Sequence, residues 1–220
     1  MEQINLQDFR KLIEQCVAFK EDIDFYEMKD VSFYDMNDKK SVEHEKALFA
    51  LKTSEDKIQQ IMLNEYRKNR HSILFDQMQE MIMESRNGNL IGGLLVMKIK
   101  QHDYEDMENI ITRSLKHRAG REAIEEIGKH HPRLLKIVEK VAIQSNDYKL
   151  INFACYIDGI NVNKLAHAVV KMNDMEKLQD FGEQHAEDLS IRTRKMLSHH
   201  FKEMESNMDS GIVMQHHRHK

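Results

Sequence analysis

The sequence has few of the residues that break helices or staple small domains. Its 220 residues include one proline, eight glycines, two cysteines and no tryptophan. Such a chain can form long helices and can bury a core without disulfide bonds. Cys16 and Cys155 stand far apart, which argues against a disulfide framework or a thiolate metal cage. The composition therefore predicts an all-α protein.

Membrane and secretion signals are also missing. No stretch reaches the ~18 to 20 apolar residues that a membrane span requires. The nearest is LIGGLLVM at residues 90–97, which polar sequence flanks. The N-terminal residues include acidic side chains and lack the basic-then-apolar order of a signal peptide. We therefore expect no transmembrane segment and a cytoplasmic location.

Neither sign of charge dominates the chain. Charged residues make up 32% of it and the net charge is −4. This balance differs from that of a polybasic nucleic-acid binder and from that of an acidic disordered tail. A surface of mixed sign is the expected result.

Hydrophobic periodicity outlines the N-terminal part of the chain. Residues 1–40 are predicted to form one amphipathic helix, over residues 6–20, followed from Glu21 to Lys40 by an acidic loop, with one short helix in it as the alternative. Residues 41–86 are predicted to be either a helical hairpin joined near residues 53–55 or one long bent helix. Ser54 resembles a helix start because its hydroxyl can accept a hydrogen bond from a free backbone N–H. The NGN sequence at residues 87–89 is expected to end this part with a turn or a C-cap.

Residues 87–205 are predicted to be an array of helical hairpins. Three aspartates follow an apolar run and precede another, and each is predicted to be a helix N-cap. The residue before each aspartate is expected to end the preceding helix in the left-handed backbone region. The three pairs are His102 with Asp103, Asn146 with Asp147, and Asn173 with Asp174. Such short links would make neighbouring helices antiparallel.

The spacing of these pairs indicates repetition. Asp147 and Asp174 lie about 27 residues apart, within the range typical of helical arrays. The helix, Asn-Asp, helix segments at residues 134–156 and 162–184 resemble the hairpins of an α-solenoid. The predicted fold is therefore a stack of antiparallel helical hairpins, α-solenoid-like, and the alternative is an irregular helical bundle.

The remaining signals mark helix ends. Gly120 and Gly128 are predicted to stop helices, and Pro132 to lie in the first turn of the next helix. A last amphipathic helix is expected over residues 188–205, before a flexible His-rich tail at residues 206–220. Its predicted apolar positions are Leu189, Ile191, Met196, Leu197 and Phe201.

Catalytic and cofactor signatures are absent from the sequence. It contains no HExxH, no spaced Cys/His set and no Gly-x-Ser-x-Gly. GNLIGG at residues 88–93 lacks the Gly-Lys-Ser/Thr of a phosphate loop, and its glycines instead indicate close helix packing. The histidine groups with the best spacing are His199 and His200 with Glu203, the pair His130 and His131, and His216, His217 and His219 in the tail. We predict no metal site, no cofactor and no catalytic residue.

One stretch, residues 113–136, has a basic excess, whereas the first 45 residues are acidic. Its basic residues are Arg113, Lys116, Arg118, Arg121, Lys129, Arg133 and Lys136. Such a cluster could contact phosphates, but aromatic residues for base stacking are not interleaved with it. A basic face for an acidic protein partner, or for the acidic N-terminal segment, is favoured.

The functional hypothesis is a protein–protein interaction module, such as an adaptor, regulator or effector, that presents a helical-repeat surface. The first alternative is a helical protein that binds nucleic acid through residues 113–136. The second is a helical enzyme whose catalytic groups meet only in the folded chain. The missing motifs favour a protein that is not an enzyme.

Overall fold

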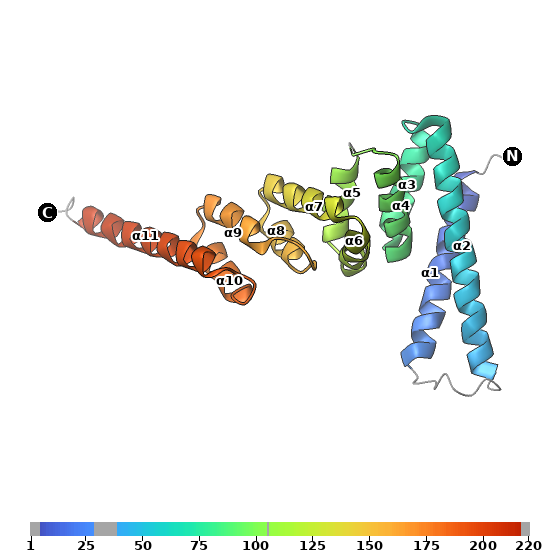
Figure 1. Ribbon diagram of the computed structural model, residues 1–220, viewed down its shortest axis with the longest axis horizontal. Helices are drawn as coiled ribbons and strands as arrows, with labels where there is room; N and C mark the ends of the chain where they lie inside the picture. The colour runs from blue at the N-terminus through green and yellow to red at the C-terminus, as the bar shows by residue number, and fades with distance from the viewer. Residues whose placement is uncertain (1–4, 29–38, 105, 217–220) are drawn as a thin grey trace. The chain divides into compact units, whose positions relative to one another are not determined.

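The described part of the chain is all-helical, as predicted. The computed structural model describes residues 5–28, 39–104 and 106–216, which form eleven α-helices and no strand (Figure 1). Among these residues, none of the helices combines the length and the apolar character needed to cross a bilayer. The chain divides into two compact units, Met1–Ala123 and Ile124–Lys220, and each is described by itself.

The first unit is built from three successive pairs of helices. They are α1 (Leu6–Met28) with α2 (Lys39–Asn69), α3 (Ile73–Ser85) with α4 (Gly88–Lys100), and α5 (Met107–Leu115) with the start of α6 (Arg118–His130). Helices α1 and α2 lie side by side (Figure 1). Across the pairs, α1 packs on α3, α2 on α4, and α3 on α5. Fully buried Phe9, Ile58, Phe75 and Leu95 are part of the core.

The predicted loop from Glu21 is wrong for residues 21–28, which continue helix α1. The aromatic and acidic residues of this segment show no clear period in the sequence, yet Ile23 is buried with only 6% of its surface exposed. Packing against α2 therefore extends the helix where the local pattern is weak. Of the rest of the predicted loop, residues 29–38 lie outside the described residues, and Lys39 and Lys40 begin α2.

Of the two alternatives predicted for residues 53–55, the hairpin is wrong and the single helix is found, because α2 is continuous there. Ser54 lies inside the helix, and the turn comes at residues 70–72. Ser72 is the N-cap of α3, since its hydroxyl oxygen accepts a hydrogen bond from the Phe75 N–H at 3.1 Å. Glu55 is buried, and its carboxylate accepts hydrogen bonds from α4 instead of serving a helix start.

The turn predicted at residues 87–89 is shifted by one residue. Arg86 ends α3 with a φ of 52°, and Asn87 begins α4, its side-chain oxygen accepting from the Leu90 N–H at 3.1 Å. His102 has the predicted positive φ, 55°. Asp103 is not an N-cap, because α5 begins at Met107 and the Asp103 side chain is buried against other partners.

The second unit contains the end of α6 and five further helices. They are α7 (Pro132–Ser145), α8 (Tyr148–Cys155), α9 (Val162–Lys171), α10 (Met175–Gln184) and α11 (Ile191–His216). The N-cap predictions at Asp147 and Asp174 are confirmed, with carboxylate oxygens 2.9 and 3.1 Å from the N–H groups of Lys149 and Lys177. Asn146 and Asn173 have φ values of 50° and 52°, and Pro132 is the first residue of α7, as predicted.

Polar contacts join the successive helix pairs of this unit. Helix α7 packs on α9, and α9 on α11. The Glu139 carboxylate of α7 accepts from the Asn161 N–H at 3.0 Å and from Lys164 Nζ at 2.7 Å. The Tyr148 hydroxyl of α8 donates to Asp180 of α10 at 2.5 Å. First helices thus contact first helices, and second helices contact second helices.

Several predicted helix ends differ from the structure. Gly120 and Gly128 lie inside α6, so neither stops a helix. A Cβ on Gly128 would lie 2.5 Å from the Leu135 side chain, so close packing explains this glycine. Helix α11 continues to His216, so residues 206–216 of the predicted tail are helical, and residues 217–220 lie outside the described residues. Ile191 is 67% exposed and does not join the buried face.

Candidate functional site: a groove between helices α2 and α4

Helices α2 and α4 run parallel, as three contacts along them show. Near the start of α4, the Glu55 carboxylate accepts from the side-chain amides of Asn87 and Asn89, at 3.1–3.2 Å. One turn further along both helices, Gln59 lies against Gly93. Beyond this pair, Tyr66 of α2 lies beside Lys98 of α4. Residue numbers therefore rise together along the two helices.

Gly93 allows the side chain of Gln59 to lie against α4. A Cβ at this position would lie 2.5 Å from the Gln59 side-chain nitrogen, closer than real contacts allow. The packing role predicted for the glycines of residues 88–93 is thus confirmed at Gly93. The segment is helical from Gly88, so it forms no phosphate-binding loop.

A groove of about 490 Å³ runs between the two helices. Its apolar lining includes Met62, Leu63, Leu90, Leu94, Val96 and Met97. Exposed Asp56, Arg67 and Lys100 also line the groove. Because α2 and α4 are parallel, Asp56 and Leu90 lie toward one end, and Arg67 and Lys100 toward the other. The groove combines these apolar side chains with Gln59, Gln60 and Gln101, and it has opposite charges at its two ends.

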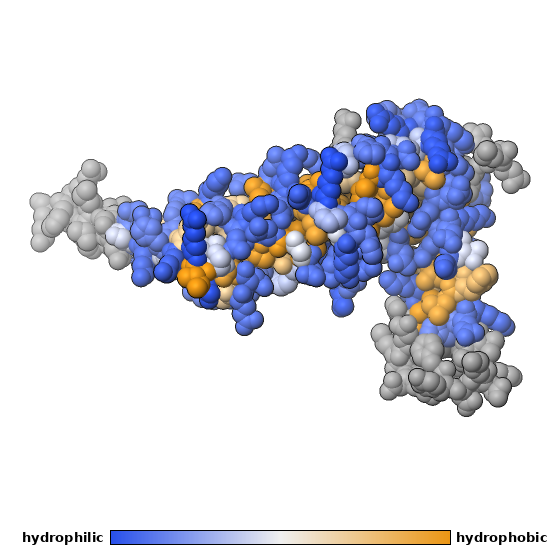
Figure 2. All heavy atoms as spheres, in the orientation of Figure 1, coloured by the Kyte–Doolittle hydropathy of each residue, from blue (hydrophilic) through white to orange (hydrophobic). Residues whose placement is uncertain are grey.

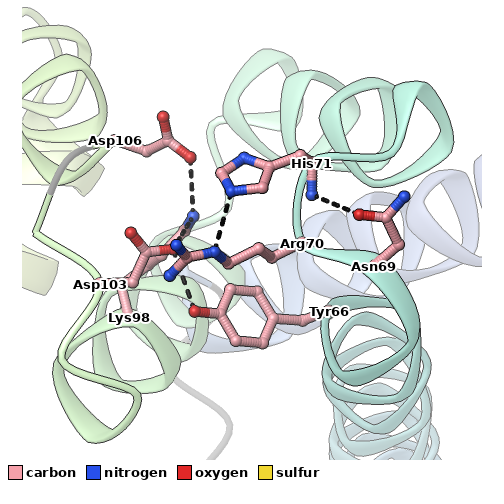
Figure 3. Close-up of polar contacts among 7 residues, drawn as sticks. All are labelled: Tyr66, Asn69, Arg70, His71, Lys98, Asp103 and Asp106. Atoms are coloured by element: carbon pink, nitrogen blue, oxygen red, sulfur yellow. Dashed lines mark hydrogen bonds and ion pairs between the residues drawn. The ribbon is translucent and has the colours of Figure 1, made fainter.

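A buried lysine, Lys98, lies on α4 between groove-lining Met97 and Lys100, and Figure 3 shows its polar contacts. The Lys98 side chain has no exposed surface, and its Nζ lies 3.0 Å from Asp103 Oδ2 and 2.9 Å from Asp106 Oδ2. The same ammonium is 5.4 Å from the ring centroid of Tyr66 and 5.1 Å from that of Phe75. These contacts satisfy the charge, because each carboxylate accepts a hydrogen bond and the two rings provide cation–π attraction.

The residues around Asp103 determine its ionisation. Burial alone would raise the pKa of this carboxyl, but the hydrogen bond and charge of Lys98, with help from Tyr66 and Arg70, hold the pKa below its ordinary value. The Tyr66 hydroxyl donates to Asp103 at 3.1 Å. Asp103 is therefore ionised in the folded protein at neutral pH and fixes the α4–α5 turn against α2.

Arg70 and His71 complete the polar surroundings of this turn (Figure 3). Arg70 Nε donates to His71 Nε2 at 2.9 Å, and the His71 N–H donates to the side-chain oxygen of Asn69 at 3.1 Å. Both side chains are exposed. The cluster thus has a buried ionic centre and a hydrated edge.

The sequence analysis missed the Lys98 cluster. A lysine inside the apolar run of residues 90–99, followed by aspartates five and eight positions later, was the available signal. Such a lysine needs a nearby charge if it is buried. The contributions of Tyr66 and Phe75 were not visible, since they come from other helices.

The predicted basic residues are divided between the two units. Arg113, Lys116, Arg118 and Arg121 belong to the first, and Lys129, Arg133 and Lys136 to the second. At least three of the seven form ion pairs with carboxylates of their own unit. These pairs are Arg113 with Glu80 at 2.5 Å, Arg118 with Glu122 at 2.6 Å, and Lys129 with Glu126 at 2.9 Å. The stretch therefore has a smaller unpaired charge than its sequence suggested.

The histidine and cysteine candidates have separate positions. His199 and His200 lie 3.4 and 3.7 Å from Glu203, but the described residues contain no group of three or more ligands able to hold a metal. Cys16 and Cys155 are buried and unpaired. Burial raises the pKa of Cys16 to about 11 and that of Cys155 to about 12. Neither thiol is activated as a nucleophile.

Exposed apolar side chains also occur outside the groove. Leu48 and Phe49 of α2 are 42% and 76% exposed, and Figure 2 shows an apolar patch among hydrophilic residues on the α1–α2 pair. Isolated apolar side chains are common on protein surfaces, so these two residues alone define no site. The groove is the stronger candidate because it combines a concave apolar lining with ordered charges.

The chain matches no protein-family model, no curated protein and no solved structure.

Proposed function

We propose that the protein is a protein–protein interaction module, acting as an adaptor, regulator or effector, whose α2–α4 groove binds an amphipathic helix of its partner. One observation carries this proposal: the groove has an apolar lining with Asp56 at one end and Arg67 and Lys100 at the other. Grooves between helices are a common binding site for amphipathic helices, whose apolar residues recur at i, i+3, i+4 and i+7.

The geometry of the groove suggests the length and direction of the bound helix. Asp56 and Arg67 are eleven positions apart on α2, which spans about 16 Å or three helical turns. A helix antiparallel to α2 and α4 would place its N-terminus near Arg67 and Lys100. Acidic residues stabilise a helix N-terminus and basic residues its C-terminus. The proposed ligand is therefore acidic in its first turn and basic in its last.

We also propose that the helix pairs form an α-solenoid-like stack. The supporting contacts recur in each unit, where first helices pack on first helices. Short capped turns at Asp147 and Asp174 keep paired helices adjacent. A cytoplasmic location is part of the proposal, because Cys16 and Cys155 are both free, as is usual in a reducing compartment.

The alternative functions have less support. A nucleic-acid-binding surface would require basic groups that are not paired with carboxylates, whereas Arg113, Arg118 and Lys129 are paired in this way. An enzyme would require a reactive group within reach of solvent. Lys98 is the most unusual ionisable residue beside the groove, yet it is fully buried and bonded to two aspartates.

Two synthetic helical peptides of one composition would test the proposed ligand. One has glutamates in the first turn and lysines in the last, and the other has these charges exchanged. We expect the first to bind more tightly in a fluorescence-anisotropy titration of the full chain. Reversing both Arg67 and Lys100 to glutamate makes both ends of the groove acidic and should remove the preference, because ordered rim charges set the orientation of a ligand. The matched control is Lys116→Glu, which changes an exposed charge outside the groove.

A third variant separates groove binding from general charge attraction. Leu63 lines the groove and is only half-buried, so Leu63→Glu should abolish binding of both peptides without unfolding the chain. Binding of equal strength in this variant would refute the groove as the site. A gel shift with mixed RNA and DNA completes the test: tight, steeply salt-dependent binding would favour the nucleic-acid alternative.

A further inference from the structure

The last helix of the second unit differs from the first helices that precede it. Helix α11 packs on α9 and α10, as a further first helix after the pairs α7–α8 and α9–α10. In those pairs the second helices also contact each other, through hydrogen bonds from Tyr148 to Asp180 and from Asn152 to Gln184. Within the described residues, no helix follows α11. The position that a second helix would take, against α10 and α11, is therefore not filled by the described part of the chain.

A groove of about 350 Å³ lies between α10 and α11. A Cβ added to Gly182, which lines the groove, would meet only Cδ1 of Leu197, at 4.0 Å, so the space over this glycine is open. Apolar side chains of both helices and of the turn between them also line the groove, and they are Leu178, Leu189, Leu197 and Phe201. The groove has the apolar lining and the open access that a docked helix requires.

Four residues of α11 form a stripe along this groove, which we call the α11 stripe. Arg194, Ser198 and Phe201 line the groove, and Glu205 is the next residue on the same side of the helix. Residues three and four positions apart are neighbours on one face of a helix, so the four side chains lie in a row. Arg194 and Glu205 are exposed, and neither has an ion pair within the described part of the chain. The α11 stripe therefore has a positive end, a negative end and an aromatic ring between them.

The α11 stripe is complementary to a second copy of itself. If a second α11 lies antiparallel to the first about a two-fold axis between residues 199 and 200, Arg194 faces the partner's Glu205. The same axis places Ser198 opposite the partner's Phe201, a small side chain opposite a large one. A two-fold axis repeats every contact, so two ion pairs form, about 16 Å apart along the helix.

We propose that the chain forms a two-fold symmetric dimer, in which α11 of each copy docks in the α10–α11 groove of the other. The position against α10 and α11 fits an antiparallel helix, because short turns make each second helix of this unit antiparallel to its first. The dimer uses the second unit, whereas the proposed α2–α4 groove belongs to the first. Either proposal can therefore fail without the other.

The length of α11 also favours a second copy as the occupant. Helix α11 has 26 residues, whereas α9 and α10 have ten each, and Figure 1 shows that α11 continues beyond both. This length lets one α11 reach across the whole groove of its partner. A helix of a different protein would need the same order of charges on its face, which α11 already has.

The first experiment measures the mass of the full chain by sedimentation equilibrium over a range of concentrations. We expect a monomer–dimer equilibrium that weakens as salt is added, because the paired charges are exposed. A chain that stays monomeric at about 1 mM would overturn the proposal and leave the groove to a helix of a different protein.

Charge reversal tests the pairing of Arg194 with the partner's Glu205. Arg194→Glu and Glu205→Arg should each weaken the dimer by about tenfold to a hundredfold, because each replaces both ion pairs by like charges. An equimolar mixture of the two single variants should regain the wild-type affinity as a heterodimer, since both pairs then have opposite charges. The double variant should regain it as a homodimer for the same reason.

Arg192→Glu is the matched control. Arg192 is exposed and lies two positions before Arg194, on the other side of α11, so this change should leave the dimer intact. Circular dichroism checks that each variant keeps its helices. A dimer that Arg194→Glu weakens no more than Arg192→Glu does, or that the mixture of single variants fails to restore, forms through another surface and would overturn the assignment.

Discussion

The buried ion pair of Lys98 gives the sharpest prediction about stability. In Lys98→Met the apolar stem is kept and the ammonium is lost. Asp103, with 7% of its side chain exposed, then keeps the Tyr66 hydroxyl as a donor and the nearby charge of Arg70, whereas Asp106, with 46% exposed, can be rehydrated. Breaking a buried pair by removing one partner costs about 3–5 kcal/mol. We expect a loss in this range for Lys98→Met and less than about 1 kcal/mol for Asp106→Asn.

The double variant separates the net stabilisation by the ion pair from the free-energy cost of an unpaired buried charge. Lys98→Met with Asp103→Asn removes both charges, so it should be less destabilised than Lys98→Met alone. Urea titrations with hydrogen-exchange mass spectrometry as the readout measure these free energies. This readout reports the exchange of peptides from the first unit separately from that of peptides from the second. If Lys98→Met costs less than about 1 kcal/mol, or no more than Asp106→Asn, Lys98 is not the buried partner of Asp103 and the reasoning is refuted.

The ion pair also predicts the direction of acid sensitivity. The pKa of Asp103 is lower in the folded protein than in the unfolded chain. Its contribution to stability is therefore complete above the unfolded pKa and is lost as the pH falls through the folded value. The stability difference between wild type and the Lys98→Met, Asp103→Asn variant should shrink only in strong acid, below about pH 4.

Three further predictions concern the turns, the glycines and a thiol. Asp147→Ala and Asp174→Ala should each lower the free energy of unfolding by about 0.5–2 kcal/mol, measured by urea titration, and unchanged midpoints would show that these caps contribute nothing. Gly120→Ala should destabilise by about 1–3 kcal/mol because its Cβ meets backbone, whereas Gly93→Ala meets a flexible side chain and should be nearly neutral. Native Cys155, with its pKa raised to about 12, should resist iodoacetamide at about pH 7.5, and rapid labelling seen by mass spectrometry would contradict its burial.

Local signals in the sequence were enough to predict the helical fold class and the positions of several turns. Asp147 and Asp174 were predictable because an N-cap depends on residues two or three positions away. Asp103 follows the same local pattern, yet it serves Lys98 and Tyr66 instead. Its role depends on a helix 37 positions earlier in the chain, which no local pattern contains.

The candidate groove was not predictable for a related reason. Its lining comes mostly from apolar residues of α2 and α4 that a periodicity analysis assigns to the core. The charged ends, Asp56 and Lys100, look like ordinary surface residues in the sequence. Only the parallel arrangement of the two helices orders these charges along one groove.

The lengths of the turns determine where the chain can accept extra residues. Arg86 and Asn87 join two helices with almost no spare backbone, and Asn146 and Asp147 do the same. One added residue would rotate the following helix by about 100° and move its apolar face from the core. The connection at residues 156–161 is different, because exposed Gly159 lies at its tip with a φ of 83°. We therefore expect inserted residues to be tolerated at residues 156–161 and to destabilise the protein at the tight turns. Differences in chain length between related proteins should accordingly occur at residues 156–161.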